Sequence, residues 1–216
     1  MTTRDTLRAL PVLAHQMPSF DPANAPAEPM TLFADWLTEA VAAGVDEPHA
    51  MTLSTVDADG APDARVLILK DLDTAGWHFA TSAISAKGRQ LAADPRVALT
   101  FHWREQGRQV RVRGTARAAD PAVSRRDFLA RPEGSRIATL AGRQSAVLAD
   151  RAELDRELAA VRARLAADPG LVAEGHTVYS VHPASVEFWQ ADRERRHVRL
   201  RYRRDADGWS RELLWP

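Results

Sequence analysis

Cysteine is absent from this 216-residue sequence, and lysine occurs at only two positions. Without cysteine the chain cannot form disulfides, use a thiolate nucleophile or ligate a metal or iron–sulfur cluster through sulfur. No hydrophobic run approaches the length of a membrane span, and the first residues lack the apolar segment of a signal peptide. We therefore expect a soluble cytoplasmic protein that does not associate with membranes.

An excess of either charge is also absent, because 29 Lys and Arg residues balance 29 Asp and Glu residues. Nucleic-acid-binding proteins usually carry a basic excess, so no nucleic-acid partner is expected. The sequence has no glycine-rich Rossmann or P-loop motif, and any nucleotide must be bound in another way. The basic strip Arg195–Arg204 leaves a non-enzymatic flavin- or nucleic-acid-binding module as an alternative hypothesis.

Both lysines lie in segments suited to phosphate binding. Lys70 ends the run Ala64–Lys70, and Lys87 follows Ser85 in a Ser-Ala-Lys-Gly-Arg segment. Lysine is a compact point charge, whereas arginine is a planar fork of five donors. A chain that uses arginine almost everywhere is expected to keep lysine where that difference matters. The alternative is that both are ordinary surface lysines.

Residues 1–29 are rich in proline and alanine and predict an irregular N-terminal arm, followed by one domain over residues 30–216. A helix is expected from Pro29, and the hydrophobic period then changes to two, with two Asp-Ala-Asp-Gly hairpin turns. Strands are expected at 51–56, 64–70, 77–81, 97–103, 109–116, 177–181, 185–189, 197–202 and 209–214, and further helices at 85–94, 121–130, 135–140 and 151–166. This order predicts an α+β fold, an antiparallel barrel or sandwich with peripheral helices.

The segment Ala80–Gly88 predicts an anion site. A strand ends there, three hydroxyl residues follow, and Ser85 is placed to cap a helix. Free backbone N–H groups, the helix dipole and Lys87 would then converge. An ordinary capped helix with an exposed lysine is the alternative.

Arg65 and Lys70 are five residues apart in one expected strand, so they should point to opposite faces and serve different groups unless a bulge intervenes. The residues between them are apolar at both odd and even positions, so both faces of the strand are apolar. This pattern predicts a buried central strand. In the same way, strict alternation predicts that Arg195, His197 and Arg199 share one strand face. That face could hold an anionic ligand, or it could be a solvated basic edge.

These segments together resemble the pyridoxamine 5′-phosphate oxidase family over nearly the whole chain from about residue 30. The resemblance is carried, in order, by Arg65-Val66-Leu67-Ile68-Leu69-Lys70, Ser85…Lys87-Gly88, Gly107-Arg108-Gln109-Val110, Arg131-Pro132…Ser135, Gln144-Ser145, Glu187-Phe188-Trp189-Gln190 and Arg195…His197…Arg199.

The resemblance implies a homodimeric split β-barrel with FMN at the subunit interface and no metal. It implies hydride transfer from the substrate's C4′ to the flavin, with dioxygen reduced to hydrogen peroxide. FMN contacts would come from Arg65, Val66, Leu69, Lys70, Ala80, Thr81, Ser85, Ala86, Lys87, Gln109, Gln144, Ser145, Trp189 and Arg199. Lys70, Arg131 and Ser135 would hold the substrate phosphate together with position 127, and Arg195 and His197 would be the catalytic residues over the pyridine ring.

The sequence departs from the family mainly on the substrate side. Asp127 stands where the family usually has a phosphate-binding tyrosine, and Gly175-His176-Thr177-Val178 replaces the usual Trp-Gly-Gly. The family's N-terminal lid is not recognisable in residues 1–20. On the flavin side, Ala80 replaces an aromatic residue and Ala86 an arginine. The alternative function is therefore an FMN oxidase of the same fold with another substrate, such as a phenazine precursor.

Overall fold

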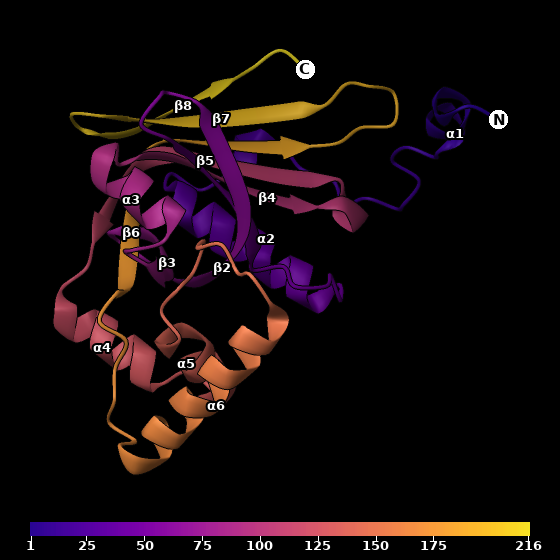
Figure 1. Cartoon of the computed structure of the whole chain (residues 1–216). Coiled ribbons are helices and arrows are strands. Elements are labelled where there is room, and N and C mark those ends of the chain that lie inside the picture. Colours follow the sequence, from indigo (N-terminus) through magenta and orange to yellow (C-terminus); the bar gives the residue numbers. More distant parts are fainter. The chain divides into compact units, whose positions relative to one another are not determined.

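The computed structural model describes residues 1–216. Its strands form one sheet in the order β3-β2-β1-β4-β5-β6-β7-β8, and β3 also pairs with β6, which closes six strands into an antiparallel barrel (Figure 1). The predicted α+β barrel with peripheral helices is confirmed. No helix combines the length and the apolar character that crossing a membrane requires.

The strands are β1 (Ala50–Val56), β2 (Pro62–Asp73), β3 (Gly76–Ser82), β4 (Arg96–Trp103), β5 (Arg108–Ala118), β6 (His176–Gln190), β7 (Val198–Asp205) and β8 (Gly208–Leu213). The helices are α1 (Thr3–Ala9), α2 (Pro29–Ala42), α3 (Ala86–Ala93), α4 (Pro121–Leu129), α5 (Glu133–Leu140) and α6 (Arg151–Ala167), with short 3-10 turns η1 (Pro22–Asn24) and η2 (Arg104–Gln106).

The chain divides into two compact units, each built from separated segments. Unit 1 contains residues 1–51, 99–113 and 183–216, and unit 2 contains residues 52–98 and 114–182. Strands β1, β4, β5 and β6 contribute residues to both units. The two units are described separately below.

Unit 1 is organised around α2, which begins at Pro29 as predicted. Its buried face contains Phe33 and Trp36, and the Trp36 ring packs edge-on against Phe188 with centroids 5.2 Å apart. The expected irregular arm contains a short helix, α1, because Thr2 and Asp5 form a reciprocal capping box. The end of the arm is held by Tyr202, whose hydroxyl donates to the Pro26 carbonyl over 2.7 Å.

Unit 2 carries helices α3 to α6, and α4, α5 and α6 lie close together at the bottom of Figure 1. Helices α5 and α6 pack through the buried side chains of Ile137, Val161 and Leu165. On the sheet, the Phe79 and Tyr179 rings stack at 5.5 Å. This packing fixes the ends of β3 and β6, from which several candidate site residues project.

Strand β6 corrects one sequence expectation, because the two predicted strands 177–181 and 185–189 form a single strand. Residues 176–181 pair with β3, and residues 185–190 pair with β7. Pro183 lies where the strand changes partners, and a residue without an N–H is tolerated where no ladder hydrogen bond is required.

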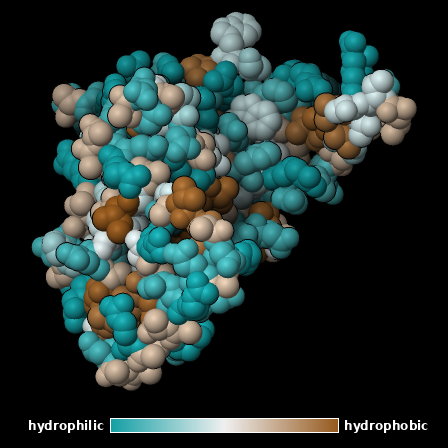
Figure 2. Space-filling model, in the orientation of Figure 1, coloured by the Kyte–Doolittle hydropathy of each residue, from teal (hydrophilic) through white to brown (hydrophobic).

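Strand β2 corrects a second sequence expectation, that of a strand buried on both faces, because one of its two faces is not buried. Val66 is 65% exposed and Ile68 is 37% exposed, whereas Leu69 is buried. The apolar run therefore does not mark a strand covered on both faces within this chain. Hydrophobic residues form several brown patches on the face of the molecule shown in Figure 2.

Candidate functional site

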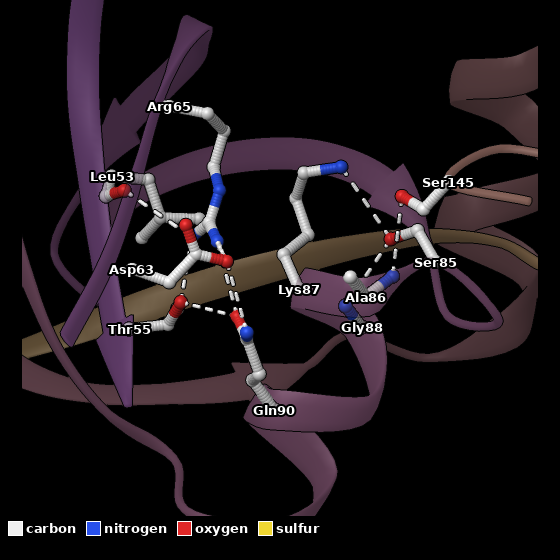
Figure 3. A network of polar contacts seen from close by, with 10 residues as sticks. All are labelled: Leu53, Thr55, Asp63, Arg65, Ser85, Ala86, Lys87, Gly88, Gln90 and Ser145. Carbon is white, nitrogen blue, oxygen red and sulfur yellow. Dashed lines mark hydrogen bonds and ion pairs between the residues drawn. The ribbon is translucent and has the colours of Figure 1, made fainter. Parts of the chain in front are cut away.

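The start of α3 forms a compact polar centre in unit 2 (Figure 3). Ser85 is the N-cap, as predicted, and its Oγ accepts from the Gly88 N–H over 3.2 Å and donates to the Ser82 carbonyl over 2.7 Å. A Cβ on Gly88 would lie only 2.3 Å from the Ala83 carbonyl oxygen, so the turn requires glycine at this position. The first N–H groups of the helix thus face one point together with the dipole's positive end.

Lys87 extends its ammonium toward this point, where Nζ donates to Ser85 Oγ over 3.4 Å. The residue is only 7% exposed, and no carboxylate lies within ion-pair distance of its Nζ. Burial lowers the pKa of Lys87 and the nearby Arg65 charge lowers it further, while the Asp63 charge raises it without outweighing them. A buried cation with no carboxylate in ion-pair contact indicates a site for an anionic ligand.

Arg65 lies beside Lys87 and is held in place by the protein itself. Its guanidinium donates to Thr55 Oγ1 over 2.6 Å and to Gln90 Oε1 over 3.1 Å, and it pairs with Asp63 at 2.5 Å. Gln90 Nε2 also donates to Asp63, which lowers the pKa of that carboxyl. Thr55, Asp63 and Gln90 were not predicted as site residues. Only the positions of Thr55 in β1, Asp63 in β2 and Gln90 in α3 relative to Arg65 would have indicated these residues.

A cavity of about 840 Å³ opens elsewhere in unit 2. Its lining brings together the predicted residues Val66, Lys70, Ala80, Thr81, Arg131, Ser135 and Gln144 from β2, β3, α5 and the segments beside α5, and it adds His176. Arg65 is absent from this lining while Lys70 is present. The two side chains therefore do not share this cavity, as strand parity predicted for their faces, although a bulge lies between Leu69 and Asp71. That they serve different ligand groups stays a prediction.

Asp127 lies behind this lining and contacts two residues that form it. One of its carboxylate oxygens is 3.2 Å from Lys70 Nζ, and the other is 2.7 Å from His176 Nε2. Burial raises the pKa of Asp127, but hydrogen bonds from His176 and Lys70 outweigh it, and the net pKa is lowered. His176 was noted only as part of a sequence departure and not as a site residue. It lines the cavity and contacts Asp127, so it becomes a candidate.

The remaining predicted flavin-side residues of unit 2 lie in two places, the β2–β3 ladder and the start of α3. Leu69 is buried opposite Phe79 in the β2–β3 ladder. The Ala86 N–H donates to Ser145 Oγ over 3.4 Å, which ties the segment before α6 to this helix start. Ser145 has a positive φ of 72°, an uncommon conformation for a residue other than glycine.

The other predicted residues belong to unit 1. Trp189 faces Arg199 in the β6–β7 ladder, and its ring lies 4.9 Å from the His197 ring. Glu187 accepts from Arg199 Nε over 2.9 Å and also pairs with Arg111. Gln109 is a half-buried residue of β5. Glu187 belongs to the Glu187-Phe188-Trp189-Gln190 motif, but the sequence predicted no role for it.

The prediction that Arg195, His197 and Arg199 share one strand face is wrong. Strand β7 begins only at Val198, and Arg195 lies in the preceding turn with φ 67°, where its N–H donates to the Asp192 carbonyl. His197 Nδ1 accepts from the Asp192 N–H over 3.0 Å, which leaves Nε2 as the free ring nitrogen. The chain forms a tight turn here, whereas the alternation of arginine with other residues predicted an extended strand.

Comparison with known proteins gives consistent matches over nearly the whole chain. Residues 37–165 match the pyridoxamine 5′-phosphate oxidase family, and residues 176–216 match the pyridoxine 5′-phosphate oxidase C-terminal dimerisation region. A pyridoxine/pyridoxamine 5′-phosphate oxidase of Pseudomonas paraeruginosa is 46% identical, with 90% of this chain and 91% of that protein covered. One of Burkholderia lata is 42% identical over all of both chains.

A solved structure is also similar. PhzG from Burkholderia lata, in complex with tetrahydrophenazine-1-carboxylic acid, superposes with a TM-score of 0.85 at 31% identity, covering 93% of this chain and 99% of that one. The order of motifs, the barrel and the two family matches agree. The chain belongs to the pyridoxamine 5′-phosphate oxidase family.

Proposed function

We propose that this protein is an FMN-dependent oxidase that converts pyridoxamine or pyridoxine 5′-phosphate to pyridoxal 5′-phosphate. The observation that carries this proposal is the buried Lys87 ammonium, which lies beside Arg65 at a helix start and has no carboxylate partner. A phosphate monoester supplies the charge and the acceptor oxygens that these donors require. The named relatives at 42–46% identity support the same substrate class.

The proposed cofactor fits the residues at the start of α3. Lys87, Arg65 and the N–H groups after Ser85 would bind its phosphate, and the glycine at position 88 keeps the turn compact. FMN, when bound, accepts a hydride equivalent from the substrate and passes two electrons to dioxygen, which yields hydrogen peroxide. Within unit 2, Gln144 and Thr81 are proposed to hold the rest of the flavin. The family resemblance proposes the same role for Trp189 and Arg199, which are ladder partners in unit 1.

The substrate is proposed to enter the cavity that Lys70, Arg131 and Ser135 line. Lys70 and Arg131 would bind its phosphate. For Arg195 and His197 of unit 1, the family resemblance proposes that they orient the pyridine ring. Oxidation removes a hydride from C4′ and a proton from the attached oxygen or nitrogen, so that the alcohol becomes an aldehyde and the amine an imine that water hydrolyses.

The protein is further proposed to act as a homodimer. Residues 176–216 match a dimerisation region, and unit 2 exposes apolar side chains such as Val66 and Val147, the latter 92% exposed. Such side chains are commonly covered by a partner subunit.

The second candidate is an FMN oxidase of a different substrate. It is favoured by Asp127, a carboxylate in contact with the proposed phosphate-binding Lys70, and by the similarity to PhzG.

The two candidates are distinguished by aerobic incubation of the purified flavin-loaded protein with pyridoxine 5′-phosphate, with unphosphorylated pyridoxine as the control. Formation of pyridoxal 5′-phosphate with an equal amount of hydrogen peroxide supports the first. A flavin-loaded protein inert toward both pyridoxine and pyridoxamine 5′-phosphates contradicts it.

A further inference from the structure

Two departures from the family pattern, far apart in the sequence, meet in the structure. Asp127 occurs where a tyrosine is usual, and His176 belongs to the segment that replaces Trp-Gly-Gly. Asp127 Oδ2 and His176 Nε2 are 2.7 Å apart, and the His176 side chain is almost fully buried. Because both departures form one hydrogen-bonded pair beside Lys70 and Arg131, they change the site as a unit.

The pair carries a negative charge. Hydrogen bonds from His176 and Lys70 keep the pKa of Asp127 low despite its burial. Burial lowers the pKa of His176, the Arg131 and Lys70 charges act in the same direction, and the opposing effect of Asp127 does not outweigh them. A neutral His176 that donates from Nε2 to Asp127 satisfies these conditions and leaves Nδ1 facing Arg131 NH1 at 3.5 Å.

The cationic side chains of the cavity are mostly neutralised already. Lys70 is paired with Asp127 at 3.2 Å, and Arg143 is paired with Glu153. Arg131 differs, because its hydrogen bonds go to Thr139 Oγ1 at 2.8 Å and to the neutral His176 ring. It is the cation of this lining that has no carboxylate in ion-pair contact. The carboxylate of Glu157 also lines the cavity, so the charges of the lining and of Asp127 offset one another, and a dianion would add uncompensated negative charge.

The uncharged part of the lining contains more apolar than polar side chains, which suits an aromatic ring. The apolar ones include Val66, Ile68 and Leu154, and the polar ones include Thr81, Ser82, Ser135, Thr139 and Gln144. A second negative charge on a ligand at Lys70 and Arg131 would lie close to the Asp127 carboxylate, and the repulsion would offset part of the attraction.

We propose that Asp127 and His176 are specificity-determining residues that make this cavity prefer a singly charged anionic group over a phosphate dianion. The singly charged group is a carboxylate or a tetrahedral monoanion on an aromatic ring compound. The inference rests on the proposed function only in taking the cavity as the substrate site.

The direct test compares two ligands of equal shape and different charge. 4-Deoxypyridoxine 5′-phosphate and 4-deoxypyridoxine 5′-sulfate have a methyl group at C4 and cannot be oxidised there. At about pH 8, roughly two units above the second pKa of a phosphate monoester, the phosphate is a dianion and the sulfate a monoanion. Calorimetric titration of the flavin-loaded wild-type protein then gives both dissociation constants, and phenazine-1-carboxylate serves as the planar monoanion.

The wild-type protein is expected to bind the sulfate at least as tightly as the phosphate. In Asp127→Asn the phosphate should gain about tenfold more affinity than the sulfate, the effect of one nearby unit charge in a partly solvated site. Asp155→Asn, an exposed position on α6 outside the lining, is the matched control and should leave the ratio unchanged. Binding of phenazine-1-carboxylate distinguishes a planar carboxylate from a tetrahedral monoanion as the preferred group.

Three results would overturn the proposal. The first is a wild-type protein that binds the phosphate at least tenfold more tightly than the sulfate. The second is a ratio of the two dissociation constants that Asp127→Asn does not alter, and the third is no binding of any of the three ligands. The wild-type comparison holds even if the variant fails to fold. If the protein oxidises pyridoxine 5′-phosphate and also binds the phosphate much more tightly than the sulfate, the proposed function stands and this inference is refuted. If it binds the monoanions tightly but does not oxidise pyridoxine 5′-phosphate, this inference stands and the proposed function is refuted.

Discussion

Lys87 donates from Nζ to Ser85 Oγ over 3.4 Å, and Ser85 in turn caps the helix on which Lys87 lies. Lysine and cap are thus parts of one turn, which we propose binds an anion. Because no carboxylate is in ion-pair contact with the buried ammonium and the Asp63 charge offsets its burial only in part, the flavin-free protein bears a cost for that charge, and ligand binding should relieve it.

Replacing Lys87 with methionine therefore separates ligand binding from stability. FMN affinity should fall by roughly 10- to 100-fold, the effect of losing one charge-assisted hydrogen bond to a phosphate. Riboflavin, which has no phosphate, should bind with unchanged affinity. The flavin-free variant should be as stable as the wild type or more so. Equal losses for both flavins in fluorescence titrations would show that Lys87 does not contact the phosphate.

Substitution of Gly88 by alanine tests the geometry of the same turn. The added Cβ would approach the Ser82 and Ala83 carbonyl oxygens to 2.4 and 2.3 Å. The backbone must move, and we expect a loss of about 1–3 kcal/mol in unfolding free energy, measured by denaturant titration. Gly134→Ala is the control, because nothing lies within 4 Å of its added Cβ and stability should be unchanged or slightly raised. Equal effects at both positions would contradict the close approach.

Acidification should destabilise the protein through His176. Because its folded pKa lies below the ordinary value near 6.5, the unfolded chain takes up a proton first as the pH falls. The unfolding free energy should therefore decrease as the pH falls from about 6.5 toward the folded pKa. His176→Gln keeps an N–H donor for Asp127 and does not titrate, so its stability should be flatter over this interval. An identical pH profile for the two proteins would refute the assignment.

Glu187 is expected to be structurally important in unit 1, since it accepts from both Arg111 and Arg199 and its side chain is 8% exposed. Glu187→Gln should cost about 1–3 kcal/mol, because two guanidinium groups lose a buried counter-charge. Glu212→Gln removes the comparable but exposed pair with Arg201 and should cost less than about 1 kcal/mol. Similar losses for both variants in thermal unfolding would be inconsistent with the difference in burial.

The sequence was most informative where local chemistry determines local structure. The Ser85 cap, the start of α2 at Pro29 and the hairpin turns depend on neighbouring residues, and each was predicted from them. Strand parity likewise separated Arg65 from Lys70. These features require no knowledge of distant contacts.

The missed features depend on contacts between distant segments. Alternation of arginines around His197 suggested a strand, but the Asp192–His197 turn was stabilised by hydrogen bonds that the pattern does not reveal. Asp127 likewise contacts Lys70 and His176, which are distant in the sequence, and its own position in the sequence does not reveal these partners. The exposure of Val66 and Ile68 was also missed, because it depends on which distant segments cover β2.

In the proposed function, a flavin held at the Lys87 turn accepts electrons from a B6 phosphate. Anaerobic addition of pyridoxine 5′-phosphate to the purified flavin-loaded protein is the decisive experiment, with the visible flavin absorption as the readout. We expect that the absorption bleaches with one equivalent of substrate, that pyridoxal 5′-phosphate appears, and that the absorption returns on admission of dioxygen. An unchanged flavin spectrum in the presence of saturating pyridoxine and pyridoxamine 5′-phosphates would contradict the proposed function.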